Sequence, residues 1–304
     1  MQIEVEGADP LRFGDGSPVR AASAVTSFGG GLLVVQDDAT HGAWFRGAEA
    51  TAVRLLPPVE GLETFEELSG TKHLKPDLEA ACPVELDGQD AVLLLGSGSS
   101  PRRMRWALLR LTDDGPRAAV ADLTLLYDAV AGALGVGLDV LNLEGACVVG
   151  EALRWFNRGL PSAGLPSGSV DLDLAAALEA ALGVRDPGTV PVTNRLRYEL
   201  GEVQGVGLAV TDAVALPDGA ILLSAAAEDS PNPRDDAPVV GSALVRLDEH
   251  AVQQVTSLPL VGGQVCKVEG LMLLDASPAG TRLLAVVDGD DPCTPSLAIR
   301  LRVG

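Results

Sequence analysis

Short apolar runs, separated by breaks rich in glycine and aspartate, recur along the chain. Residues 141–149, in which Glu144 is the only carboxylate, are followed after a break by a second apolar run that leads into a polar exit at residues 157–159. Glycine supplies the positive φ that hairpin turns need, and apolar runs of this length are typical of strands. The pattern therefore predicts pairs of antiparallel strands joined by tight turns.

This hairpin pattern occurs five times, and each copy carries a polar residue at a similar place in its first run. The five residues are Ser23, Glu79, Glu144, Asp212 and Glu269, at intervals of 56 to 68 residues. Such an interval suits a four-stranded propeller blade, and the continuous apolar second runs suit strands covered on both faces. We therefore predict an all-β fold, with one β-propeller domain over residues 1–304, in five blades of four antiparallel strands or, as the alternative, six blades.

Weaker strand patterns follow the hairpins and supply the outer strands of the blades. They cover residues 42–45, 52–56, 105–111, 118–123, 242–247 and 251–258. The fifth copy is one strand short, because only residues 296–303 remain after its hairpin; residues 2–6 can supply the missing strand and close the ring. Residues 125–137 and the end of residues 169–182 favour short helices.

The composition changes the picture mainly through its charge. Hydrophobic residues make up 47% of the chain, as in globular proteins, but the formal net charge is −20. This charge disfavours nucleic acid and anionic membranes as partners and favours a small polar molecule or a cation, although it can equally serve solubility. No leader-like start and no apolar run of about 18 residues is present, so we expect a cytoplasmic protein without a membrane span. We also expect a monomer.

The inner strands of a propeller line its central channel. Glu79, Glu144, Asp212 and Glu269 are therefore predicted to converge there, with Ser23 in the fifth place. Such carboxylates repel one another unless a cation, a lysine or protonation compensates, and hard oxygen ligands suit Ca²⁺. Lys75 and Lys267 are candidate counter-charges. Alternatively, each carboxylate caps backbone amides of the neighbouring blade and binds no ligand.

The ends of the second strands are expected to lie at the same mouth of the channel as the starts of the first strands. There, Arg102, Arg103 and Arg158 can bind an anionic group, or can form salt bridges with nearby acids. These acids include residues 37–38, 228–229 and 288–291. The predicted ligand-binding residues are Lys75, Arg102, Arg158, Glu228, Asp229 and Lys267.

Neither the serines nor the histidines and cysteines of the chain indicate catalysis. Residues 96–99 (GSGS) do not have the spacing of a hydrolase nucleophile elbow. His41, His73 and His250 are interpreted as loop residues. The four cysteines lack a CxxC pair, which argues against a zinc site, and Cys82 and Cys147 are predicted to be buried. No catalytic residue is assigned.

Five segments stand out as motifs: residues 75–79 (KPDLE), 96–99 (GSGS), 142–145 (NLEG), 156–159 (FNRG) and 225–229 (AAAED). With them, the chain resembles an uncharacterised bacterial propeller family that neighbours the phytase-like, or esterase-like, propellers. The resemblance implies a β-propeller without an established activity. The glutamate–glycine opening of the blades is more distantly similar to the calcium-dependent gluconolactonase and regucalcin group, which has six blades and binds its metal through an inner-strand glutamate.

Three functions follow from these observations as hypotheses. The first is a propeller that binds a divalent cation or small polar ligand in an acidic funnel. The second is a metal-dependent hydrolase in which Ca²⁺ polarises a lactone or phosphoester and a carboxylate acts as base. The third is a scaffold for protein interaction, which an exposed apolar patch would favour.

Overall fold

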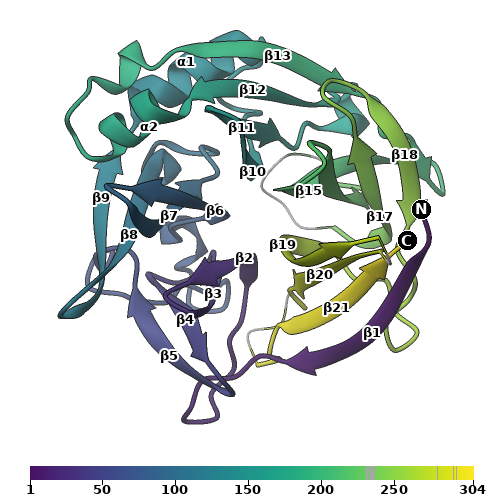
Figure 1. Ribbon diagram of the computed structural model, residues 1–304, viewed down its shortest axis with the longest axis horizontal. Coiled ribbons are helices and arrows are strands. Elements are labelled where there is room, and N and C mark those ends of the chain that lie inside the picture. The colour runs from purple at the N-terminus through teal and green to yellow at the C-terminus, as the bar shows by residue number, and fades with distance from the viewer. Residues whose placement is uncertain (231, 233–236, 279, 290, 292) are drawn as a thin grey trace.

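Five antiparallel sheets surround a central axis (Figure 1). The computed structural model describes residues 1–304 except 231, 233–236, 279, 290 and 292. Blade 1 contains β2 (Ala22–Phe28), β3 (Gly31–Gln36), β4 (His41–Arg46) and β5 (Glu49–Arg54). Blade 2 contains β6 (Leu78–Leu86), β7 (Gln89–Gly96), β8 (Arg105–Thr112) and β9 (Gly115–Asp122). Blade 3 contains β10 (Leu143–Val149), β11 (Ala152–Asn157), β12 (Ser167–Asp173) and β13 (Val192–Tyr198).

The last two blades complete the ring. Blade 4 contains β14 (Glu202–Val203), β15 (Val206–Ala215), β16 (Ile221–Glu228), β17 (Val239–Leu247) and β18 (Val252–Ser257). Blade 5 contains β19 (Val268–Ser277), β20 (Gly280–Val287), β21 (Leu297–Val303) and the amino-terminal β1 (Ile3–Pro10), which pairs with β21. The prediction of five blades closed by an amino-terminal strand is confirmed.

Each inner strand carries an irregularity in its pairing with the second strand of the blade. The bulged positions are Ser23, Glu79, Glu144 with Gly145, Thr211 and Glu269. A bulge removes one residue from the hydrogen-bonded ladder and re-aims its side chain. The polar residue of each repeat is therefore not an ordinary member of the sheet.

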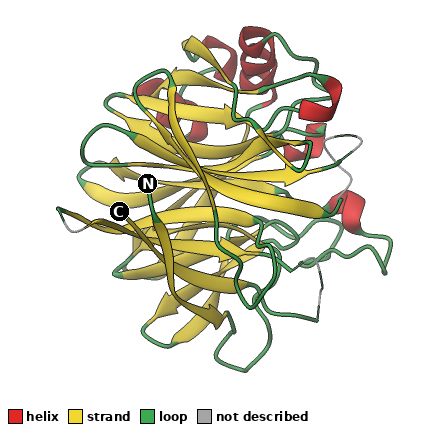
Figure 2. Cartoon of the chain, turned by 90° about the vertical axis from the view of Figure 1, so that its right-hand side faces the viewer, coloured by secondary structure: helices red, strands yellow, loops and turns green. Residues whose placement is uncertain are grey.

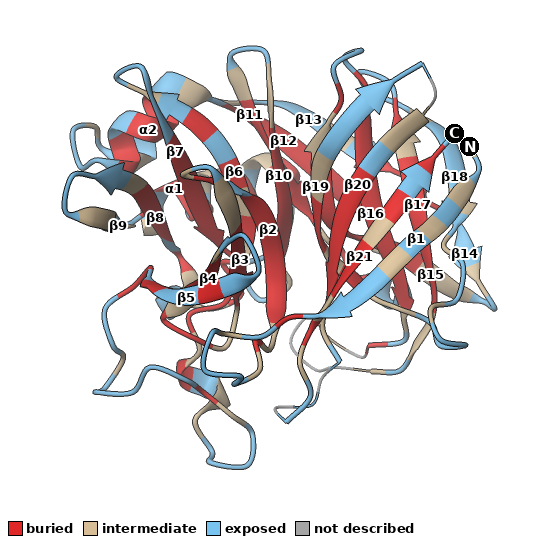
Figure 3. Ribbon diagram, turned by 60° about the horizontal axis from the view of Figure 1, so that its bottom comes forward, coloured by how far each residue is buried: buried red, intermediate tan, exposed pale blue. Residues whose placement is uncertain are grey.

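The apolar side chains of the described residues form five clusters, each at a junction between neighbouring blades. The largest side chains gather between blades 2 and 3, where the rings of Trp106 and Trp155 meet edge to face at 5.2 Å. Tyr127 packs against Trp155 at 5.0 Å. Because each blade buries both faces, the core is a ring of interfaces around the channel, as Figure 3 shows by burial.

Two short helices cover the junction between blades 2 and 3. They are α1 (Thr124–Leu134) and α2 (Leu174–Ala181), and both were predicted. Gly135, at φ +70°, ends α1, and the carboxylate of Asp173 accepts a hydrogen bond from the amide of Ala176 at the start of α2. Four 3₁₀ turns lie in the connections: η1 (Lys72–Leu74), η2 (Pro101–Arg103), η3 (Pro161–Ala163) and η4 (Pro187–Thr189).

Three features of the fold were not predicted. The outer strand β13 alternates exposed polar residues with few apolar ones, so its pattern was too weak to identify. The two-residue strand β14 is too short to leave a pattern. His41 was expected in a loop, which is wrong, because it is the first residue of β4 and pairs with Arg54.

Figure 2 shows that strands dominate the molecule and that the helices lie at its periphery. Among the described residues, no helix has both the length and the apolar character that crossing a bilayer requires. Residue 279 in the expected last hairpin turn and the acidic Asp290 lie outside the described residues.

Candidate functional site

Three of the bulged residues are glutamates, and all three line one cavity in the central channel. Glu79, Glu144 and Glu269 reach it from β6, β10 and β19, whose inner ends surround the axis in Figure 1. The cavity has a volume of about 90 Å³. It therefore has room for a hydrated ion or a few water molecules.

The other two bulges carry hydroxyl groups that tie neighbouring blades together. The hydroxyl of Ser23 donates to the carbonyl oxygen of Leu78 at 2.6 Å, directly before Glu79. The hydroxyl of Thr211 donates to the carbonyl oxygen of Val268 at 2.5 Å, directly before Glu269. The same contact, repeated in blades 1 and 4, fixes the start of the next inner strand and so the position of its glutamate.

Thr211, and not Asp212, is thus the bulged residue of blade 4, so the alignment from sequence is one residue out in this blade. Asp212 is 4% exposed, and its Oδ2 accepts a hydrogen bond from the amide of Leu271 at 2.6 Å. Burial raises the pKa of Asp212 well above its usual value. Its contact with the backbone of blade 5 is the capping role that the sequence left open as an alternative.

A lysine and two aspartates occupy one side of the mouth. The ammonium group of Lys75 bonds to Asp37 and lies 2.7 Å from Oδ1 of Asp77. Oxygen atoms of Asp37, Asp77 and Glu79 lie within 4.8 Å of one another, close enough to hold a metal ion. Lys75 already places one positive charge between two of these carboxylates.

Asp77 is also held by the loop that follows β7. Its Oδ2 accepts hydrogen bonds from the hydroxyls of Ser97 and Ser99 and from the guanidinium of Arg103, the last at 2.9 Å. Gly98 has a φ of +73°, and a Cβ there would lie 2.4 Å from the ring of Tyr127. The GSGS segment is therefore the aspartate-binding loop of the mouth.

A second ion-pair network lies on the opposite side of the mouth. The guanidinium of Arg158 lies 3.2 Å from Glu144 and 2.7 Å from Glu228. The ammonium of Lys267 lies 3.0 Å from Glu228 and 2.9 Å from Glu269. Two cations thus bridge three carboxylates from blades 3, 4 and 5, and the expected pairing of Lys267 with its neighbouring glutamate is confirmed.

Two of the channel glutamates nevertheless have carboxylate oxygen atoms without a hydrogen-bond partner among the described residues. Glu144 is 5% exposed; Asn142 donates to its Oε1 at 2.8 Å, but its Oε2 is buried without a hydrogen-bond partner. Glu79 forms no hydrogen bond or ion pair with any described residue. A buried oxygen that is neither solvated nor bonded costs free energy, so the cavity is incomplete without a further donor or a cation.

The acidic side chains of the mouth fall into two groups, one with raised and one with lowered pKa values. Burial raises the pKa of Glu79 well above its usual value, and the charges of Asp77 and Asp37 add to the rise. Burial also raises the pKa of Glu144, and that of Glu269 to about 7. For Asp77, burial alone would raise the pKa, but Lys75 and Arg103 lower it to about 2.

Glu228 belongs to the ionised group. Burial alone would raise its pKa, but Lys267 and Arg158 lower it to about 2. The permanent negative charges at neutral pH are therefore already paired with cations. The three channel glutamates, in contrast, have raised pKa values, and a divalent cation that binds them would favour their ionised form.

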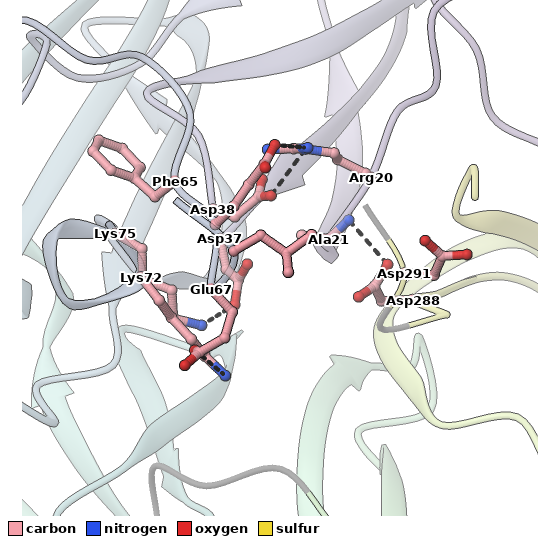
Figure 4. A pocket seen from close by; sticks show the side chains of 12 residues that line it. Arg20, Ala21, Asp37, Asp38, Phe65, Glu67, Lys72, Lys75, Asp288 and Asp291 are labelled. Carbon is pink, nitrogen blue, oxygen red and sulfur yellow. Dashed lines mark hydrogen bonds and ion pairs between the residues drawn. The ribbon is translucent and has the colours of Figure 1, made fainter. Parts of the chain in front are cut away.

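A wider vestibule adjoins the cavity and shares five lining residues with it: Ala21, Asp37, Lys72, Lys75 and Asp288. The vestibule measures about 340 Å³ and opens between the long connection from β5 to β6 and the loop after β20 (Figure 4). Arg20 and Asp38 form an ion pair of 3.0 Å on one side of the vestibule. The two hollows together form a funnel with a broad outer part and a narrow acidic inner part.

The structure places the other predicted site residues apart from this centre. Arg102 is exposed and lies 3.2 Å from Glu60, whereas its neighbour Arg103 turns into the mouth. Asp229 is exposed, while the adjacent Glu228 is bonded to Arg158. His73 is exposed in η1, and its Nδ1 lies 3.0 Å from the carbonyl oxygen of Gly70. Lys75, Arg158, Glu228 and Lys267 are brought together around the three glutamates.

Asp77 is the residue that the sequence did not identify as part of the site. Its φ of +59° is unusual for a residue other than glycine, and aspartate is among the few that tolerate it. The signal available in the sequence was its place two residues before Glu79, within the KPDLE segment.

The opposite end of the channel is apolar. A cavity of about 280 Å³ is lined there by the inner strands and includes Cys82 and Cys147. Both cysteines are free and buried, as predicted. Burial raises the pKa of the Cys82 thiol to about 12, so this thiol is unreactive at neutral pH.

A comparison with models of protein families shows to which family the chain belongs. Residues 71–292 match the family of unknown function DUF6910. The chain belongs to this family. The matched part of this DUF6910 chain contains Glu79, Glu144 and Glu269, together with Lys75, Arg158 and Lys267. None of the curated proteins compared with the chain matches it in sequence.

Solved structures resemble the chain only at a distance. A luciferin-regenerating enzyme shares 8% identity over 98% of this chain and 96% of its own, with a TM-score of 0.45. A thermostable family-43 glycoside hydrolase shares 8% identity over 96% and 92%, with a TM-score of 0.42. A gluconolactonase from Xanthomonas campestris shares 12% identity over 98% and 73%, with a TM-score of 0.30. At this level of likeness no residue role is transferred.

Proposed function

We propose that this propeller binds a divalent cation, Ca²⁺, through Glu79, Glu144 and Glu269 at the narrow part of the funnel. The observation that carries the proposal is the buried Oε2 of Glu144, which has no partner and faces the same cavity as the unbonded carboxyl of Glu79. Carboxylate oxygens are the ligands that Ca²⁺ prefers, and water can complete its coordination in the cavity.

The neighbouring set of Asp37, Asp77 and Glu79 is a poorer cation site as it stands. Lys75 already bonds to both aspartates, so a metal ion there would have to displace the ammonium group of a side chain that is only 16% exposed. Binding by the three glutamates leaves the contacts of Lys75 intact, although it has to share Glu144 with Arg158 and Glu269 with Lys267. Glu79 is shared by both sets and can turn towards either.

The ligand that follows from this arrangement is small and polar. A bound cation would lie at the bottom of the vestibule, where a hydroxyl, carbonyl or phosphoryl oxygen of a ligand can coordinate it. The strong net negative charge of the chain disfavours nucleic acid and anionic membranes, and we propose a monomer that takes its ligand from solution.

Thermal unfolding in the presence of Ca²⁺ tests the cation site. Millimolar Ca²⁺ is expected to raise the melting temperature of the wild type by about 5 °C, because a ligand that binds only the folded state stabilises it. Glu144→Gln is expected to lose this shift and, without Ca²⁺, to melt close to the wild type, since its amide oxygen can still accept the hydrogen bonds of Asn142 and Arg158.

The matched control is Glu202→Gln, which changes an exposed glutamate of β14 outside the funnel. It should keep the full Ca²⁺ shift, and NaCl at equal ionic strength should produce no shift of similar size. A wild-type melting temperature that millimolar Ca²⁺ leaves unchanged, or an equal shift in Glu144→Gln, would refute the site.

A metal-dependent hydrolase is the second candidate, and the pKa of Glu269 favours it. At a pKa of about 7, this carboxyl can exchange a proton near neutrality, beside a cation that polarises the substrate. A lactone or phosphoester that enters through the vestibule would meet both groups. Ca²⁺-dependent hydrolysis of a simple lactone or nitrophenyl phosphate that is lost in Glu269→Gln would establish it, and no turnover of either class would leave cation binding alone.

A further inference from the structure

A groove on the outer rim, between blades 2 and 3, has no role in the funnel. It has a volume of about 370 Å³; residues 119–122 of β9 form its floor, and residues 180–183 with Arg185 and Pro187 form its wall. β9 is the outermost strand of its blade and lies at the periphery in Figures 1 and 3. No described strand pairs with its outer edge, so its backbone can accept another strand there.

Two arginines that do not line the groove stand opposite each other in the same sheet, two residues along β9 from the groove floor. Arg110 of β8 is the cross-strand partner of Arg117 of β9. Neither side chain forms an ion pair or hydrogen bond with a described residue, and the turn carboxylates Asp113 and Asp114 form no ion pair with them. Like charges directly opposite each other destabilise a sheet, and the chain contains 42 acidic residues that could have compensated them.

The arginine pair shares a face with the groove floor. Side chains alternate along a strand, so Arg117, Ala119 and Ala121 project to one side of β9. Ala119 and Ala121 pair with Leu108 and Trp106, which belong to the core cluster that also contains α2. The floor is therefore apolar at Ala119 and Ala121, beside α2. The two positive charges lie beyond its Ala119 end, and Asp122, whose carboxylate accepts a hydrogen bond from Thr124, lies at the other end.

Exposed apolar side chains surround the groove. Leu182 and Val184 follow α2 and are 37% and 76% exposed, and Leu125 at the start of α1 is 54% exposed. Apolar side chains next to unpaired arginines are the composition of a binding surface, where the apolar part supplies affinity and the arginines supply specificity.

We propose that this groove binds an extended acidic segment of a partner protein. The segment pairs with the open edge of β9, places small or apolar side chains over Ala119 and Ala121, and sets a carboxylate or phosphate against Arg110 and Arg117. Guanidinium groups bind such anions through paired hydrogen bonds, and the backbone contacts are those of strand addition. A membrane has no backbone that could pair with the open edge of β9, which favours a peptide segment as the occupant.

Fluorescence anisotropy with defined peptides tests this surface. The probes are a labelled octapeptide of alternating glutamate and valine, the same peptide with lysine for glutamate, one with phosphoserine for glutamate, and one with N-methylated backbone amides. The glutamate and phosphoserine peptides are expected to bind, and the lysine and N-methylated peptides to bind at least about tenfold more weakly. Hydrogen exchange of the β9 amides should slow in the bound state.

Arg117→Glu is expected to weaken binding of the glutamate peptide by at least about tenfold, because it reverses one charge of the pair. Its melting temperature should equal or exceed that of the wild type, since the repulsion with Arg110 is removed. The matched control is Arg302→Glu, an exposed arginine on β21, which should leave peptide binding unchanged.

Equal binding of the lysine peptide, or full binding by Arg117→Glu, would overturn the proposal. So would exchange protection confined to strands other than β9. Binding of the wild type to phosphatidylserine vesicles that Arg117→Glu abolishes, without binding of any peptide, would assign the surface to a membrane and overturn it as well.

Discussion

The carboxylate of Asp77 combines an unfavourable backbone conformation with a dense set of favourable contacts. The φ of +59° at Asp77 costs conformational energy, and Asp77 is only 3% exposed. Lys75, Arg103 and the loop serines compensate by bonding to the carboxylate, and they keep it ionised. Asp77 therefore anchors the mouth, and the channel glutamates beside it remain available to a ligand.

Asp77→Asn should destabilise the protein by about 3 kcal/mol, because it leaves two buried cations facing a neutral group. Chemical denaturation measures the change. Asp87→Asn is the matched control, since Asp87 has a similar φ of +53° but lies in the exposed turn between β6 and β7. It should change the free energy of unfolding by less than about 0.5 kcal/mol; equal effects of the two substitutions would contradict the anchoring role.

Asp38 predicts how stability depends on pH. Burial and the charge of Asp37 raise its pKa to about 7, above the value of an unfolded chain. The folded state therefore binds more protons than the unfolded state between about pH 4 and 7, so Asp38 lowers the stability of the wild type as pH rises through this range, and no further above it.

Asp38→Asn removes this titration. Relative to the wild type, its free energy of unfolding should rise by up to about 4 kcal/mol from pH 4 to pH 8, with the rise complete near pH 8. Urea unfolding at several pH values measures it. A difference between the two proteins that is independent of pH would show that Asp38 titrates normally.

At the scale of the elements, the bulged inner strands explain both what the sequence predicted and what it did not. Apolar runs with one polar residue, followed by glycine- and aspartate-rich breaks, identified every inner strand, and with it the three channel glutamates. A bulge shifts the strand register by one residue, so Thr211 and Asp212 could not be distinguished in blade 4. The same uncertainty separates Arg102 from Arg103, because adjacent residues of a short turn face different surroundings that only the fold defines.

The glycine after Glu144 is needed because neighbouring inner strands approach closely. A Cβ at Gly145 would lie 2.8 Å from backbone atoms of Asp212 and Ala213 in the next blade. Gly145→Ala should therefore force the two strands apart and destabilise the fold by about 2 kcal/mol, as overpacking does. It should also weaken Ca²⁺ binding, since it shifts the adjacent Glu144.

Gly132→Ala provides the contrast. Gly132 lies in α1, and a methyl group added there would meet no atom within 4 Å outside its own helix backbone, so alanine should stabilise the helix by about 0.5–1 kcal/mol. Melting temperatures of the two variants should move in opposite directions. A Gly145→Ala variant as stable as the wild type would show that the inner strands have space to separate.

At the scale of the whole molecule, a strand pair between distant parts of the chain helps to close the ring. β1 is the outer strand of blade 5, paired with β21 through a register that runs from Ile3 with Val303 to Pro10 with Leu297. The two strands join the first and last segments of the sequence and complete the last sheet. The interfaces between blades 4, 5 and 1 rely on this closure.

Removal of residues 1–10 should therefore expose the edge of β21 and destabilise the protein by several kcal/mol. Light scattering after size-exclusion chromatography should show association through the open edge, and denaturant unfolding should show the loss of stability. Glu4→Gln is the control, because it breaks only the exposed ion pair with Arg302 and should cost less than about 1 kcal/mol. A truncated protein that stays monomeric and equally stable would show that β1 is dispensable.

The pairing of β1 with β21 also determines how the molecule responds to a mechanical load. The strands are antiparallel, and the amide of Gln2 donates to the carbonyl oxygen of Gly304 at 2.8 Å, so the two chain ends lie side by side. A force that pulls these ends apart acts across the ladder and breaks its hydrogen bonds one after another, from the Ile3 end to the Pro10 end. The propeller should therefore unfold at low force, because its hydrogen bonds break sequentially. Blade 5 should open first, while the junction between blades 2 and 3 that holds α1 and α2 is still intact.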